Sequence, residues 1–209
     1  NEAPMLAELV QAGSLPPVDE RLPTNPLVMP VAEQIGTYGG TMRRGFRGVS
    51  DRWGPTKLQD RGLAWYDQDL NMQPRLADSW ELSEDAKEWT FNLREGTKWS
   101  DGTPFTTEAV QYWYDNEVQN TELIEYSTGT NWKTGAANTL LQLEVIDDYS
   151  FKFIFVDPNP LFLYKVGRAS PFSPGHYMQQ FHVNLTEDAA TLEAKTKEAG
   201  FESWAQYYT

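Results

Sequence analysis

Arginines and a tryptophan are concentrated in one short stretch of this acidic chain. Arg43, Arg44, Arg47 and Arg52 fall within ten residues, and Trp53 follows directly. A guanidinium binds a carboxylate through paired hydrogen bonds, and an indole ring offers a flat face for stacking. The stretch therefore predicts recognition of a carboxylate or another polar ligand at the mouth of a cleft. The commoner alternative is a set of weak ion pairs with the acidic surface.

The candidate ligand-binding residues lie in two loops that are rich in turn-forming residues. Loops carry binding groups more often than the elements that they connect. The candidates in residues 47–55 are Arg47, Ser50, Asp51, Arg52 and Trp53. The second loop, residues 127–133, contributes Trp132. For Trp132 the alternative is an aromatic side chain that fixes its loop onto the core.

Other residues that could perform chemistry are better explained by structure. The two histidines, His176 and His182, are six residues apart, whereas two ligands on one helical face need a spacing of three or four. Residues 36–40 lack the Lys-Ser/Thr of a phosphate-binding loop. The acidic pairs at 84–85 and 147–148 fall in predicted turns. We expect no catalytic residue, metal site or cofactor.

Alternating apolar residues predict the strands that must position these loops. Trp89, Phe91 and Leu93 alternate with polar residues, and residues 151–155 repeat this pattern with three phenylalanines. Residues 141–145 supply a partner strand, so the turn at 147–149 predicts an antiparallel hairpin with one buried face. The sequence therefore predicts a β-rich core.

One helix should cover this sheet. Thr106 or Thr107 can cap it, and Val110, Trp113 and Val118 lie on one of its faces. Further helices are expected at 5–11, 161–166, 175–181, 187–199 and 202–208.

The pattern divides the chain into four parts. We expect a helix and proline-rich leader at 1–36, a weak first strand with the ligand-side loop at 37–62, a β-rich subdomain at 63–170 and a truncated helical segment at 171–209. The start has neither an initiator Met nor the pattern of a secretory signal, and residues 201–209 are rich in apolar side chains. We expect a trimmed piece of a longer protein.

Composition excludes several classes of protein. The 209 residues include 17 basic and 30 acidic side chains, and a net charge of −13 would repel a nucleic-acid backbone. There is no cysteine, which excludes a disulfide framework and a thiolate zinc site. Aromatic residues make up 13% of the chain, enough to fill a β-rich core or to line a groove for sugars or peptides.

Two adjoining segments carry a family resemblance. They are residues 74–85, PRLADSWELSED, and residues 89–105, WTFNLREGTKWSDGTPF. The chain resembles the family 5 bacterial extracellular solute-binding proteins, which include oligopeptide-, dipeptide- and nickel-binding proteins. Agreement continues at 62–63, 107–110, 174–177 and 181–182, and it covers about residues 39–182. The two segments form a structural signature, because their aromatic residues face a core and their glycines permit turns.

The resemblance implies an α+β fold, a mixed antiparallel β-sheet subdomain with covering helices. This subdomain would be part of the first lobe of a two-lobed, type II, cluster C-like periplasmic-binding-protein clamshell. Ligand contacts on this side would come from the loop after the first strand, residues 47–53.

The implied function is that of a non-enzymatic component of an ABC importer. Such a monomer captures a peptide or similar polar solute in the periplasm or outside the cell and delivers it to the permease subunits. It would be peripheral to the membrane. A lipid anchor outside this sequence is one means by which it would be attached. An oligosaccharide is the alternative ligand. The rival class is a carbohydrate-active enzyme or binding module, and an enzyme of this kind needs two convergent carboxylates.

Overall fold

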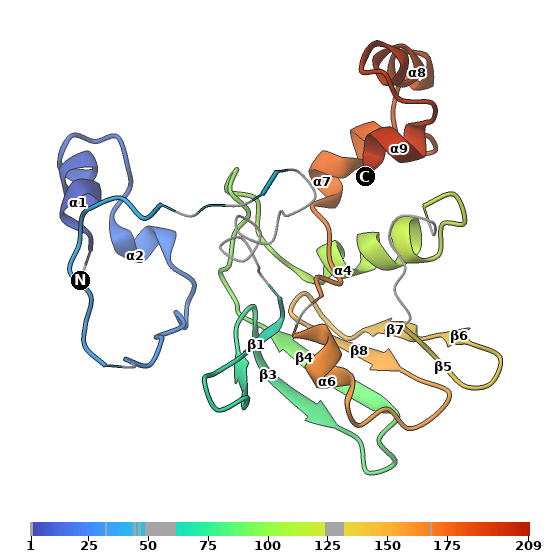
Figure 1. The fold of residues 1–209 in the computed structure, drawn as a ribbon, viewed down its shortest axis with the longest axis horizontal. Helices are drawn as coiled ribbons and strands as arrows, with labels where there is room; N and C mark the ends of the chain where they lie inside the picture. Colours follow the sequence, from blue (N-terminus) through green and yellow to red (C-terminus); the bar gives the residue numbers. More distant parts are fainter. Residues whose placement is uncertain are drawn as a thin grey trace.

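The computed structural model describes residues 2–31, 33–43, 45, 47–48, 62–123, 132–167 and 169–209. Figure 1 shows a central sheet with helices α4 and α6 against it, the C-terminal helices beyond α4, and the N-terminal leader to one side. No helix in the described ranges is long and apolar enough to cross a membrane.

The central sheet has four antiparallel strands in the order β3-β4-β8-β7. Trp89 pairs with Phe153 and Phe91 with Phe151, so the alternating aromatic residues of two strands lie on one face. The predicted hairpin of residues 141–155 is confirmed. The strands are β3 (Ala77–Leu82), β4 (Glu88–Leu93), β7 (Gln142–Val145) and β8 (Ser150–Ile154).

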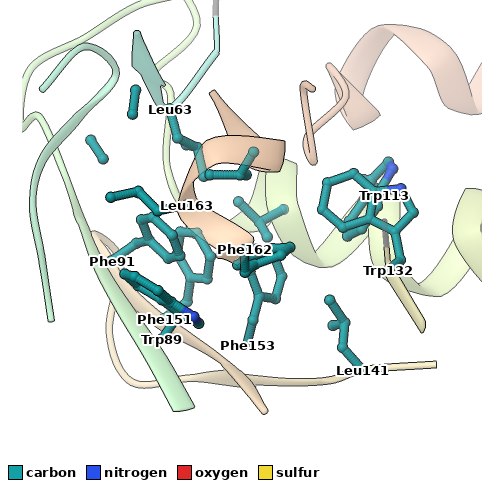
Figure 2. Packing of buried hydrophobic residues seen from close by; sticks show 14 of the residues in the cluster. Leu63, Trp89, Phe91, Trp113, Trp132, Leu141, Phe151, Phe153, Phe162 and Leu163 are labelled. Carbon is teal, nitrogen blue, oxygen red and sulfur yellow. The ribbon is translucent and has the colours of Figure 1, made fainter. Parts of the chain in front are cut away.

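The buried face of this sheet carries a core of interlocking aromatic rings. Helix α6 (Phe162–Val166) lies over the sheet and inserts Phe162, whose ring packs edge-on against Phe153 with centroids 5.7 Å apart. Figure 2 shows Phe162 at the centre of the cluster, with Phe91 and Phe151 on one side and two tryptophans on the other. Burial of these rings supplies the hydrophobic driving force for the subdomain.

The opposite face of the sheet is polar. Asn92 of β4 donates to Ser79 of β3 and accepts from Ser150 of β8, so one hydrogen-bonded row crosses three strands. On the same face Lys152 of β8 forms ion pairs with Glu144, its direct neighbour on β7, and with Glu88 of β4. A sheet with one apolar and one polar face is expected where only one side packs against helices.

The predicted covering helix is also confirmed. Helix α4 (Thr107–Trp113) begins after Thr106, whose hydroxyl accepts a hydrogen bond from the backbone N–H of Glu108. Val110 and Trp113 are buried against the core. The helix continues as a π-helix, η1 (Tyr114–Val118).

Shorter elements complete the described part of the fold. Two small antiparallel sheets are β1 (Ala64–Tyr66) with β2 (Met72–Pro74), and β5 (Lys133–Thr134) with β6 (Thr139–Leu140). The C-terminal helices are α7 (Gly175–Met178), the 3-10 turn η3 (Gln179–Phe181), α8 (Ala189–Glu198) and α9 (Trp204–Tyr208). The leader contains α1 (Pro4–Gln11) and α2 (Val18–Arg21).

The weak strand expected from residue 37 is wrong for residues 37–43, which the structure describes without strand pairing. Gly39 and Gly40 have φ of 109° and 76°, and two successive left-handed residues interrupt an extended strand. Tyr38 and Met42 are largely exposed, so no apolar face is buried that could stabilise a strand here.

Candidate ligand-binding site

The first predicted loop lies mostly outside the described residues. Arg47 is described and exposed, as is Arg43. Ser50, Asp51, Arg52 and Trp53 fall outside the described ranges. The assignment of this loop to ligand binding stays a prediction, but the structure does show how both of its flanking segments are held.

Trp132 lies in the core, with only 5% of its surface exposed. Its ring packs edge-on against Trp113 at a centroid distance of 4.7 Å and against Phe162 at 5.9 Å. Neighbouring rings occupy the surfaces that a ligand would need. The position of Trp132 therefore matches the alternative considered for it, a side chain that fixes its loop onto the core.

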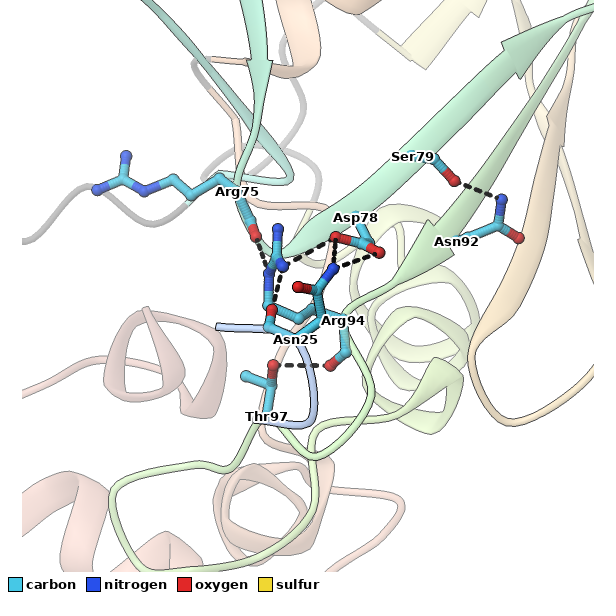
Figure 3. A network of polar contacts seen from close by, with 7 residues as sticks. All are labelled: Asn25, Arg75, Asp78, Ser79, Asn92, Arg94 and Thr97. Carbon is cyan, nitrogen blue, oxygen red and sulfur yellow. Dashed lines mark hydrogen bonds and ion pairs between the residues drawn. The ribbon is translucent and has the colours of Figure 1, made fainter. Parts of the chain in front are cut away.

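The segment before the candidate loop is fixed to the sheet by Arg94 (Figure 3). This arginine is buried at the end of β4, where its guanidinium donates to the backbone carbonyls of Asn25 and Arg75. The same group pairs with Asp78 of β3 at 2.8 Å. The side-chain amide of Asn25 donates to the Asp78 carboxylate at 3.2 Å, which closes the network. Buried charges require such partners, so Arg94 ties the leader to two strands.

Close backbone contact reinforces this attachment. The N–H of Thr24 donates to the carbonyl of Glu95 at 3.0 Å. The next residue, Gly96, has φ of 80°, and a Cβ there would lie 3.1 Å from the Thr24 nitrogen. Glycine therefore permits both the turn and the close approach of the leader. The role of Asn25 was not predicted from the sequence, because one asparagine among prolines gives no spacing signal.

The segment after the candidate loop returns directly to the core. Gly62 packs so closely that a Cβ would lie 3.0 Å from the carbonyl oxygen of Ala64 and 3.2 Å from that of Gly167. Leu63 is fully buried, and its carbonyl accepts from the N–H groups of Arg75 and Ala77. Both ends of the segment that contains the candidate loop are thus held by the β-rich part of the chain.

A small cavity of about 200 Å³ lies between α4, α7 and the turn after β4. Trp99, Tyr112 and His176 line it. Beside it, His176 bonds to the Asp101 carboxylate at 2.7 Å. The backbone N–H of Thr103 and the hydrogen bond from His176 lower the pKa of Asp101 to about 2. Asp101 is thus a permanent anion that holds a turn and a helix together at neutral pH.

One residue of each acidic pair singled out in the sequence accepts hydrogen bonds within its own turn. Asp85 accepts hydrogen bonds from the Ser83 hydroxyl and the Lys87 N–H, and these lower its pKa. Asp147 accepts from the N–H of Tyr149. Among the described residues no group of three or more His, Asp or Glu side chains is arranged to hold a metal ion.

Comparison with known proteins defines the class. Residues 71–204 match the model for the bacterial extracellular solute-binding proteins, family 5. This match covers more than half of the chain, so the chain belongs to that family.

Particular relatives differ in what their names say they bind. The periplasmic alpha-galactoside-binding protein of Rhizobium meliloti is 31% identical in an alignment 199 residues long, which covers 84% of this chain and 28% of that protein. A structure of an oligopeptide-binding protein OppA superposes with a TM-score of 0.85 at 39% identity, covering all of this chain and 32% of OppA. The structure of the periplasmic binding protein MelB of Agrobacterium fabrum, in complex with stachyose, superposes with a TM-score of 0.74 at 27% identity. It too covers all of this chain and 32% of the other chain. The fold is therefore the α+β fold of one lobe of a periplasmic binding protein, and the chain spans about a third of the length of these relatives.

Proposed function

We propose that these residues are part of the solute-binding component of an ABC importer that works in the periplasm or outside the cell. The observation that supports this proposal most strongly is the match to OppA over the whole chain, at 39% identity and a TM-score of 0.85. In such a component, closure of two lobes on a solute creates the form that the permease subunits accept. No covalent chemistry is required. The protein would be a monomer, peripheral to the membrane with or without a lipid anchor.

The proposed ligand is a peptide or a similar polar solute. Arginines in the loop at 47–53 would bind the ligand carboxylate, and Trp53 would stack on its flat groups. Attachment of the leader through Arg94 and of the following segment through Leu63 supports this role, because a binding loop is most effective on a rigid support.

An oligosaccharide is the second candidate ligand, favoured by one specific observation. The alpha-galactoside-binding relative aligns with 84% of this chain at 31% identity. In that case Trp53 would stack on a sugar ring and the arginines would bind hydroxyl groups.

Calorimetry on the full-length protein that contains these residues would test both proposals. Tripeptides to pentapeptides and stachyose would be titrated in parallel into the wild type and the variants Arg52→Ala and Trp53→Ala. Each variant should weaken binding of the preferred solute by about tenfold or more, equivalent to about 1.4 kcal/mol. Arg43→Ala, an exposed arginine outside the proposed contact set, is the matched control and should change affinity less than twofold.

The outcomes separate function from site. If neither peptides nor stachyose bind the full-length protein, the proposed ligand classes are wrong. If one class binds but the loop variants retain wild-type affinity, the function stands and the loop assignment is wrong.

The rival class, a carbohydrate-active enzyme, loses support from the described residues. Asp85 and Asp147 accept hydrogen bonds within their own turns, where they serve a local structural role. An absence of stachyose hydrolysis during extended incubation with the full-length protein would agree with a binding protein.

A further inference from the structure

His182 lies at the contact between the C-terminal helices and α4, and only 3% of it is exposed. Its ring packs edge-on against Trp204 of α9, with centroids 4.8 Å apart, and against Tyr208 at 5.9 Å. Both aromatic residues also bond to the region around η1. The Trp204 indole donates to Glu122 at 2.6 Å, and the Tyr208 hydroxyl donates to Glu117 at 2.6 Å. The imidazole is therefore enclosed where α9 docks.

Hydrogen bonding fixes His182 in its neutral form. The backbone N–H of Asn184 donates to Nδ1 at 3.3 Å, and a backbone N–H cannot reverse its direction. The side-chain amide nitrogen of Asn120, which can only donate, lies 3.1 Å from Nε2, so a donor faces each ring nitrogen. The neutral ring can accept from one of these donors, whereas the protonated ring can accept from neither. Protonation would thus exchange a hydrogen bond for a repulsive contact between two donors.

The surrounding groups have opposing effects on His182, and their sum favours the neutral ring. Burial, the largest cause, lowers the pKa of His182, whereas the backbone hydrogen bond to Asn116 and the negative charge of Glu122 act in the opposite direction. The other titratable groups at this contact are Glu117, Tyr112 and Tyr208. Burial raises the pKa of all three, so they too resist acquiring charge.

We propose that His182 is a pH-sensitive latch that holds α9 against α4 and η1 when neutral and releases it when protonated. The released ring would gain water on both nitrogens, and Trp204 and Tyr208 would lose their packing partner. The latch is a property of this chain and does not depend on which solute the protein binds.

The direction of the effect follows from proton linkage. The docked form binds the His182 proton less tightly than the open form, in which histidine has its ordinary pKa of about 6.5. Docking is therefore complete above about pH 6.5 and is lost as the pH falls below that value. Glu117 acts in the opposite direction, because the docked form holds its proton more firmly. Replacement of Glu117 by Gln should make the loss on acidification steeper.

Hydrogen–deuterium exchange of the 209-residue chain between pH 7.5 and 5 would test the latch. After correction for intrinsic exchange, protection of residues 200–209 should fall below pH 6.5, by at most about tenfold per pH unit because one proton is taken up. Protection of β4 should stay constant and serves as an internal reference. His182→Gln, which keeps a neutral donor and acceptor, should remove the pH dependence. His176→Gln is the matched control in the other histidine of the chain and should retain it.

Two results would overturn the proposal. One is constant protection of residues 200–209 across this pH range in the wild type, and the other is undiminished acid sensitivity in His182→Gln. Titration of the wild-type histidine rings by NMR gives a check that does not depend on the folding of any variant. A His182 pKa at or above 6.5 would also refute the latch.

Discussion

Arg94 is the residue on which attachment of the leader depends. Its guanidinium bonds to two backbone carbonyls and to Asp78, and the arginine side chain is 6% exposed. Replacement by alanine would leave these carbonyls without a donor and Asp78 without its cation. We predict that Arg94→Ala lowers the free energy of unfolding by about 2–4 kcal/mol, measured by urea denaturation.

An exposed ion pair provides the control for this variant. Lys197 bonds to Glu193 on α8, and both side chains are about 70% exposed. Lys197→Ala should change the free energy of unfolding by less than about 0.5 kcal/mol. Equal effects of the two variants would show that Arg94 contributes no more to the free energy of unfolding than an exposed ion pair does.

Individual residues were predictable from sequence where one local pattern determines their position. Alternation placed Trp89 and Phe91 in the core correctly, and of the two predicted helix caps, Thr106 and Thr107, the structure has Thr106. Arg94 lies within the family signature, but its bond to Asn25 joins residues 69 positions apart. Periodicity contains no information about such a contact, so the anchor emerged only from the structure.

Among the elements, the packing of α7 on α4 depends on a glycine, Gly175, which has no Cβ. A Cβ at Gly175 would lie 2.5 Å from the Tyr112 ring. Gly175→Ala should therefore push α7 away and destabilise the protein by about 1–3 kcal/mol, detectable as a lower midpoint in urea.

Gly36→Ala is the control, since no atom lies within 4 Å of its added Cβ. This variant should leave the midpoint within experimental error. If Gly175→Ala were equally neutral, α7 would have to be free to shift without loss of packing.

The turn containing Asp101 should respond to acid. Its folded pKa of about 2 lies below the ordinary 3.8, mainly because the Thr103 N–H bonds to the carboxylate and also because His176 does. The resulting stabilisation is complete above about pH 4 and is lost as the pH falls towards 2. Asp101→Asn should therefore flatten the decline in thermal midpoint between pH 4 and 2. An unchanged decline in this variant would assign acid sensitivity to other carboxyl groups.

The central sheet and α4 were predicted because each buries one side of a regular pattern. The strand expected near residue 40 was not found in the described residues, since Gly39 and Gly40 favour a turn and exposed neighbours bury no surface. The candidate site was less predictable. Local composition singled out the loop at 47–53, but packing placed Trp132 in the core, and composition alone cannot distinguish a binding tryptophan from a core one.

For the molecule as a whole, the 209 residues correspond to only part of each relative, and this limits the affinity that they can have for a solute on their own. The chain aligns with 32% of OppA, so most of the surface that would enclose a solute lies elsewhere in such a protein. We predict that the 209 residues alone bind peptides or stachyose with a Kd weaker than about 1 mM, because little ligand surface is buried. Calorimetric titration giving micromolar affinity would show that these residues contain a complete site.

Attachment at Thr24 and Asn25 on one side and at Leu63 on the other makes the intervening chain a closed loop on a fixed base. The entropy of closing such a loop grows only logarithmically with its length, so even a doubling costs about 0.6 kcal/mol. Insertions and deletions between these two points therefore cost little folding stability. Evolution can vary the length and chemistry of this region from one family member to the next while the aromatic core stays the same.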